Sequence, residues 1–91
     1  MTIRYARHPN VRTTALEGEG VALHLDSRRY FTLNETGLAL LEALAEPRTL
    51  DELVRVLTER FDVSAEDAAA TTRAFLGQCV AAGVVSATGA P

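Results

Sequence analysis

The sequence predicts an α+β domain in which a small three-stranded antiparallel sheet is followed by three helices. Segments rich in β-branched and aromatic residues occupy the first third of the chain, and the Glu17–Gly20 segment separates the first two of them. Apolar residues at helical spacing follow Asn34, and the last two helical segments open with capping signals. The 91 residues, 47% hydrophobic and 23% charged, fit one globular domain.

The three predicted strands cover residues 11–16, 21–26 and 30–33. The two glycines of the Glu17–Gly20 segment allow the positive φ angles of a hairpin connection. In the second strand, Val21, Leu23 and Leu25 form an apolar face, and the residues between them form a face of mixed polarity. This alternation predicts a half-buried strand.

The three helices are predicted from their end signals. Asn34 is suited to cap a helix over residues 35–45, which a proline closes two residues later. Thr49 and Glu52 have the spacing of a capping box at the start of the second helix. Ser64 opens the third helix, which runs to about residue 82, where Gly83 can end it in the left-handed conformation.

The ends of the chain lack periodic patterns. Residues 1–10 contain Pro9 and several cations, and we expect a flexible arm there. Residues 11–86 are expected to form the domain, and residues 87–91 a flexible tail. No continuous apolar signal segment opens the chain, and its single cysteine excludes an internal disulfide. A cytoplasmic location is therefore the expectation.

The inventory of catalytic side chains is thin. All nine basic residues are arginine, which excludes mechanisms that need a lysine nucleophile or Schiff base. Cys79, His8 and His24 are the remaining candidates for a nucleophile or a metal ligand, but they lie far apart without metal-ligand spacing. We therefore expect no catalytic residue, no metal and no cofactor.

The third helix carries two apolar stripes. With Phe75 as reference and about 100° per residue, the core stripe consists of Ala68, Thr71, Thr72, Cys79 and Ala82. The second stripe consists of Ala69, Leu76 and Val80, with Arg73 among them. Packing on the first helix or on the C-terminal tail explains this stripe, but the stripe also fits the wall of a groove. A sheet edge beside such a wall can receive an extended peptide.

Three segments resemble one protein family. The run Arg29–Gly37 (RYFTLNETG), followed by a leucine-rich helix and by Pro47–Leu53 (PRTLDEL), resembles the PqqD family, in which RYF-x-LN-x-TG and RT-x-x-EL recur. The segment Phe75–Val85 is similar to the closing helix of the family and its L-x-x-AG ending. The resemblance covers residues 11–86, and residues 33–37 are its most specific part.

The resemblance implies a fold and a function. Members of this family are winged helix-turn-helix-like domains of three strands and three helices, which bind the leader region of ribosomally made precursor peptides without catalysis of their own. The leader adds as a strand to the third strand and lies against the third helix. The leader-contact positions carried over are Arg29, Tyr30, Phe31, Thr32, Leu33, Ala69, Thr72, Arg73, Leu76 and Val80.

Two pathways remain open under this resemblance. A free-standing member of this length is most similar to the recognition protein of lasso-peptide pathways, which implies the lasso leader and a transglutaminase-like leader peptidase as partners. The alternative is a peptide chaperone of pyrroloquinoline quinone biosynthesis that works with a radical-SAM enzyme.

Two functions of other classes also compete. A winged helix can bind DNA, but the net charge of −3 and a third helix whose only cation is Arg73 disfavour a nucleic-acid partner. No feature indicates a membrane partner. A structural subunit could instead use the small residues of the third helix, which are Ala70, Ala74, Gly77 and Ala81.

Overall fold

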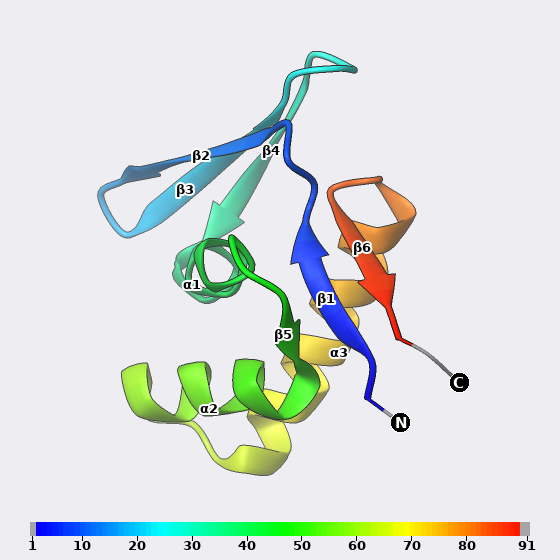
Figure 1. Cartoon of the computed structure of the whole chain (residues 1–91). Helices are drawn as coiled ribbons and strands as arrows, with labels where there is room; N and C mark the ends of the chain where they lie inside the picture. The colour runs from blue at the N-terminus through cyan, green and yellow to red at the C-terminus, as the bar shows by residue number, and fades with distance from the viewer. Residues whose placement is uncertain (1, 90–91) are drawn as a thin grey trace.

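The computed structural model describes residues 2–89 and confirms the α+β class (Figure 1). It contains the three predicted helices and the three-stranded antiparallel sheet, together with three further short strands. In chain order the elements are β1 (Arg4–Arg7), β2 (Val11–Leu16), β3 (Glu19–His24), β4 (Arg29–Asn34), α1 (Glu35–Ala43), β5 (Arg48–Thr49), α2 (Leu50–Arg60), α3 (Ala65–Ala81) and β6 (Val85–Thr88).

The predicted meander is the sheet β2-β3-β4. Leu16 pairs with Glu19 across a two-residue connection, in which Gly18 has a φ angle of 70°. His24 pairs with Arg29 across a longer turn, in which Arg28 has a φ angle of 60°. Strand β3 therefore lies in the centre, and β2 and β4 form the two edges.

The buried face of β3 is the opposite of the one that the sequence predicts. Gly20, Ala22 and His24 point inward, whereas Leu23 and Leu25 are exposed. The reason is the close approach of α1, because a Cβ atom at Gly20 would lie 2.6 Å from Cδ1 of Leu38. Small residues on this face of β3 allow α1 to pack closely on the sheet. This close packing, and not the alternation of apolar residues, decides which face of β3 is buried.

Local signals start the three helices as predicted, although α1 ends at Ala43, two residues earlier than expected. The side chains of Asn34, Thr49 and Ser64 each accept a hydrogen bond from a backbone N–H in the first turn of α1, α2 and α3. Glu52 completes a capping box by accepting the backbone N–H of Thr49, which lowers the pKa of the Glu52 carboxyl. Gly83 follows α3 with a φ angle of 75°.

A second sheet, β5-β1-β6, joins the two ends of the chain (Figure 1). The predicted arm of residues 1–10 is wrong over Arg4–Arg7, which pairs with Val85–Thr88. The predicted tail is wrong at residues 87 and 88 for the same reason, whereas residues 90 and 91 lie outside the described part. Pairing over such a distance leaves no local pattern in either segment.

The core lies where the three helices meet the sheet. Leu40 and Leu41 of α1 and Leu44, which caps its C-terminus, are fully buried in one cluster with Leu53 and Leu57 of α2. Helix α1 also packs on β2, β3 and β4, while α3 packs on α2 and on β6. Within residues 2–89, no helix is long and apolar enough to cross a membrane.

Candidate functional site

Strand β4 is an open edge of its sheet. Among the described residues it pairs with β3 alone, so its other side presents backbone groups to solvent. The strand to which the family resemblance adds the leader is therefore an edge strand. Figure 1 shows this edge on the side of the sheet that faces α3 and β6.

The ladder geometry identifies which backbone groups of β4 are open. The N–H of Leu25 donates to the carbonyl of Asn10, 2.9 Å away, so the odd-numbered residues of β3 form their bonds with β2. Because the direction alternates along an antiparallel strand, even-numbered residues such as Ala22 bond to β4. Ala22 is paired with Phe31, so the odd-numbered residues of β4 are used by the sheet.

Consequently Tyr30 and Thr32 direct their backbone N–H and C=O groups toward the open edge. An added strand would form its hydrogen bonds with these two residues. Their side chains lie on the outer face of the sheet, where Tyr30 is 72% exposed. The Phe31 and Leu33 side chains lie on the other face, toward the helices.

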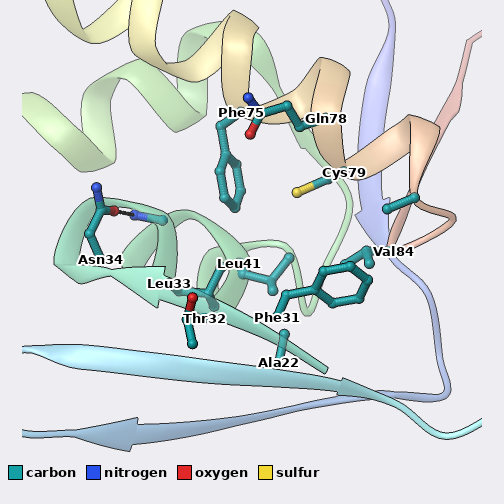
Figure 2. A pocket seen from close by; sticks show the side chains of 12 residues that line it. Ala22, Phe31, Thr32, Leu33, Asn34, Leu41, Phe75, Gln78, Cys79 and Val84 are labelled. Atoms are coloured by element: carbon teal, nitrogen blue, oxygen red, sulfur yellow. Dashed lines mark hydrogen bonds between the residues drawn. The ribbon is translucent and has the colours of Figure 1, made fainter. Parts of the chain in front are cut away.

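A cavity of about 270 Å³ opens beside this edge, between β4, α1 and α3. Figure 2 shows the ring of Phe75 directed from α3 toward α1 and β4, above Leu33 and Leu41. The cavity is mainly apolar, and the residues that line it are Ala22, Phe31, Thr32, Leu33, Asn34, Gly37, Leu41, Phe75, Gln78, Cys79, Ala82 and Val84. The open edge and the cavity together form a groove, which we call the β4–α3 groove.

Gly37 shapes the floor of the β4–α3 groove. A Cβ atom there would lie 3.0 Å from Cε1 of Phe75 and 3.3 Å from Oδ1 of Asn34. The absence of a side chain therefore lets the Phe75 ring rest against α1 while Asn34 caps that helix. This requirement gives a physical reason for the glycine in the RYFTLNETG segment.

The predicted core stripe of α3 is buried at Ala68, Thr72 and Cys79, whereas the second stripe does not form an exposed wall at Leu76. Leu76, which belongs to the second stripe, is only 3% exposed. Thr72, which the resemblance carries over as a leader contact, is 0% exposed. Arg73, Leu76 and Val80 line a separate hollow with Tyr5 and Ala87. Ala69 is half-buried and lines neither space.

The face of α3 that lines the β4–α3 groove is formed by Phe75, Gln78, Cys79 and Ala82. The helix buries two sides instead of one, because β1 and β6 cover the Leu76 side. Packing of this stripe on the C-terminal segment is one of the two interpretations that the sequence leaves open, whereas the pairing of β1 with β6 has no local signal. The stripe centred on Phe75 was the signal that could have identified the groove.

The electrostatics of the groove are weak. Of the described residues that line the cavity, Cys79 alone has an ionisable side chain. Burial raises the pKa of its thiol to about 11, so the thiol stays protonated near neutral pH. At one end of β4 the Arg29 guanidinium lies 5.9 Å from the centroid of the Phe31 ring. The groove thus offers backbone hydrogen bonds and apolar contacts rather than charge.

A family model described as coenzyme PQQ synthesis protein D (PqqD) matches residues 19–85. The chain belongs to the PqqD family. The matched range includes both strands that form the β3–β4 ladder and the whole of α3, so it contains the β4–α3 groove. No curated protein matches the sequence at a significant level.

Two solved structures share the PqqD-family fold of this chain. One is described as TbiB1 in complex with the TbiA(beta) leader peptide; it is 22% identical, has a TM-score of 0.77, and the match covers 89% of this chain and 94% of that one. The other is described as lasso peptide synthetase B1 complexed with the leader peptide; it is 20% identical, has a TM-score of 0.74, and the match covers 90% and 96% of the two chains.

Proposed function

We propose that this chain is a non-catalytic adaptor that captures the leader region of a ribosomally made precursor peptide in the β4–α3 groove. The observation that carries the proposal is the open edge of β4 beside an apolar cavity. The resemblance to two proteins whose structures contain leader peptides supports it. Membership of the PqqD family agrees with the same function.

The geometry specifies how the leader would bind. Its backbone adds to β4 and forms hydrogen bonds with Tyr30 and Thr32. Because side chains alternate along a strand, every second leader residue then faces the cavity, between Phe31 and Phe75. Backbone bonding accepts many sequences, so the apolar cavity is the part that selects among them.

The proposed contacts keep the β4 segment of Arg29, Tyr30, Phe31, Thr32 and Leu33. On α3 they shift from Ala69, Thr72, Arg73, Leu76 and Val80 to the face formed by Phe75, Gln78, Cys79 and Ala82. The buried positions Thr72 and Leu76 support the α3 backbone instead of touching the leader.

We further propose that the bound leader belongs to a lasso precursor and is presented to a transglutaminase-like leader peptidase. The lasso peptide synthetase B1 structure supports this assignment over the pyrroloquinoline quinone alternative with a radical-SAM enzyme. The adaptor has no chemistry of its own in this proposal. Support comes from the protonated, buried thiol of Cys79, which is a poor nucleophile.

Isothermal titration with the leader of the precursor encoded beside this gene tests the proposal. We expect saturable binding of one leader per chain, little change in affinity with salt, and a leader of unchanged intact mass after prolonged incubation. Cleavage of the leader by this chain alone would contradict the adaptor function. Absence of leader binding, together with tight binding to random duplex DNA at physiological salt, would favour the DNA-binding alternative.

A further inference from the structure

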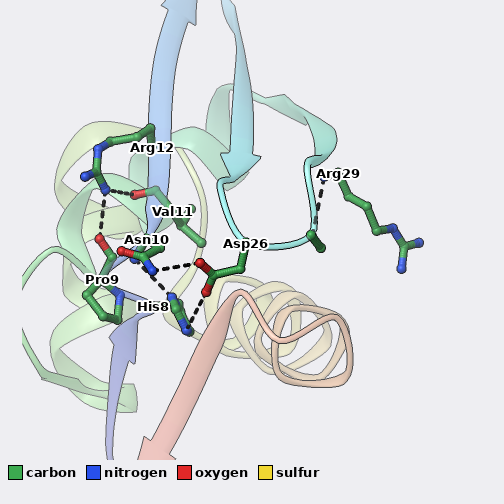
Figure 3. Close-up of polar contacts among 8 residues, drawn as sticks. His8, Pro9, Asn10, Val11, Arg12, Asp26 and Arg29 are labelled. Carbon is green, nitrogen blue, oxygen red and sulfur yellow. Dashed lines mark hydrogen bonds and ion pairs between the residues drawn. The ribbon is translucent and has the colours of Figure 1, made fainter.

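Three polar side chains with metal-binding atoms gather at the end of the sheet away from the β2–β3 hairpin. His8 lies between β1 and β2, His24 ends β3, and Asp26 lies in the turn before β4. One ligand atom from each residue lies within 4.8 Å of those from the other two. The rings of His8 and His24 have centroids 4.6 Å apart. Figure 3 shows His8 beside Asp26, where Nε2 of His8 is 3.9 Å from Oδ2 of Asp26.

Backbone hydrogen bonds hold the three segments together independently of these side chains. The N–H of His8 donates to the carbonyl of Val84 over 2.8 Å, which anchors the first ligand to the segment before β6. The N–H of Leu25, between the other two ligands, donates to the carbonyl of Asn10 over 2.9 Å. The cluster is therefore built on a fixed scaffold.

Asn10 positions two of the three side chains (Figure 3). Its backbone N–H donates to Nδ1 of His8 over 3.0 Å, and its side-chain amide donates to Oδ1 of Asp26 over 2.9 Å. The second oxygen of Asp26 is thereby turned toward Nε2 of His8. Orientation of a ligating carboxylate through its other oxygen is typical of metal sites, so Asn10 would support Asp26 in this way.

His24 is the second, independent sign of a ligand. The residue is 9% exposed, and its Nδ1 atom is buried without a hydrogen-bond partner among residues 2–89. Buried polar atoms are nearly always paired in folded proteins, so an unpaired nitrogen on an imidazole that belongs to such a cluster calls for a partner. A bound cation is one such partner, because a neutral imidazole nitrogen can donate its lone pair to a metal ion.

We propose that His8, His24 and Asp26 bind one divalent transition-metal ion of the zinc class. Two imidazoles and one carboxylate form a donor set that suits Zn²⁺ and its neighbours, with water in the remaining position. Tetrahedral zinc needs ligand atoms about 3.3 Å apart. His8 and Asp26 have side chains 36% and 58% exposed, so small side-chain rotations, with loss of the Asn10 contact to His8, would close the remaining distance.

Metal binding at Nε2 of His8 would move the proton of its ring, and the amide of Asn10 can report this change. In the neutral ring of His8 the Nδ1 atom accepts the Asn10 N–H, so Nε2 carries the proton. A metal at Nε2 displaces that proton, the neutral ring becomes protonated at Nδ1 by way of solvent, and the hydrogen bond from Asn10 is lost. The amide resonance of Asn10 must therefore shift when the metal binds.

Titration of the tag-free full chain with Zn²⁺, and with Co²⁺ as a coloured substitute, tests the site. We expect one ion per chain, a rise in melting temperature, and a shift of the Asn10 amide. His8→Ala and Asp26→Asn should each weaken binding by about tenfold or more, since each removes one of three ligands. Asp62→Asn, which removes an exposed carboxylate elsewhere, is the matched control and should bind like the parent.

Three outcomes would overturn the proposal. They are the absence of saturable binding, equal affinity in all three variants, and a cobalt–thiolate absorption band, which would assign the ion to Cys79. The buried His24 is not the primary test, because its loss can unfold the protein. Binding of the metal is measured without the leader, so its failure would leave the proposed adaptor function unaffected.

Discussion

Replacing Thr32 by proline tests the open edge of β4 without removing a hydrogen bond between β4 and β3. The N–H of Thr32 points to the open edge, so proline removes a donor that an added strand would use and that the free protein leaves to solvent. One net backbone hydrogen bond contributes about 0.5–1.5 kcal/mol. The proline ring also pushes the incoming strand away, so we expect leader affinity to fall by about tenfold or more while the protein remains folded.

Three matched variants make this prediction specific. Thr32→Val keeps the N–H and the shape of the side chain, and it should bind the leader normally. Ala15→Pro places the same ring on the opposite open edge, that of β2, and it should also bind normally. Phe31→Pro removes a donor used by β3, so it should destabilise the sheet.

Circular dichroism and isothermal titration of these variants provide the readout. The reasoning on β4 would be refuted if folded Thr32→Pro bound the leader as tightly as the parent. It would also be refuted if Ala15→Pro weakened binding to the same extent, since the leader would then use the β2 edge or neither edge.

Three further predictions concern the parts that support the groove. Leu76→Ala should lower the free energy of unfolding by about 2–5 kcal/mol in urea denaturation, because Leu76 is a core residue; a negligible loss would contradict its burial. Gly20→Ala should cost about 1–3 kcal/mol in the same assay, because the added methyl meets Leu38, and unchanged stability would argue against the close approach of α1. The Cys79 thiol should react with iodoacetamide much more slowly in the native than in the unfolded protein at about pH 8. Folding raises the pKa of the Cys79 thiol from 9.0 to about 11. The contribution of the protonated thiol to stability is therefore present below about pH 9 and is lost as pH rises through about 11. Fast alkylation of the native protein would contradict the burial of Cys79.

The features predicted correctly from the sequence depend on residues close together in the chain. The capping signals at Asn34, Thr49 and Ser64 act within one turn, and each starts a helix where expected. The hairpin between β2 and β3 depends on Gly18, which again is local. The edge position of β4 follows from the order of the three strands.

The features that the sequence did not reveal depend on distant contacts. Pairing of Arg4–Arg7 with Val85–Thr88 covers the Leu76 side of α3, so that helix buries part of its second stripe as well as its core stripe. The inward face of β3 was misjudged because α1 selects small residues there. His8 and His24 were judged to be separate, whereas the fold brings their rings together.

Amide hydrogen exchange, measured by NMR with and without the leader peptide, tests strand addition to β4 most directly. The open-edge amides of Tyr30 and Thr32 should exchange rapidly in the free protein and become protected when the leader binds. The amides of Thr13 and Ala15, on the other open edge, should remain unprotected. Binding that leaves Tyr30 and Thr32 unprotected, or that protects the β2 edge instead, would contradict the proposed function of the groove.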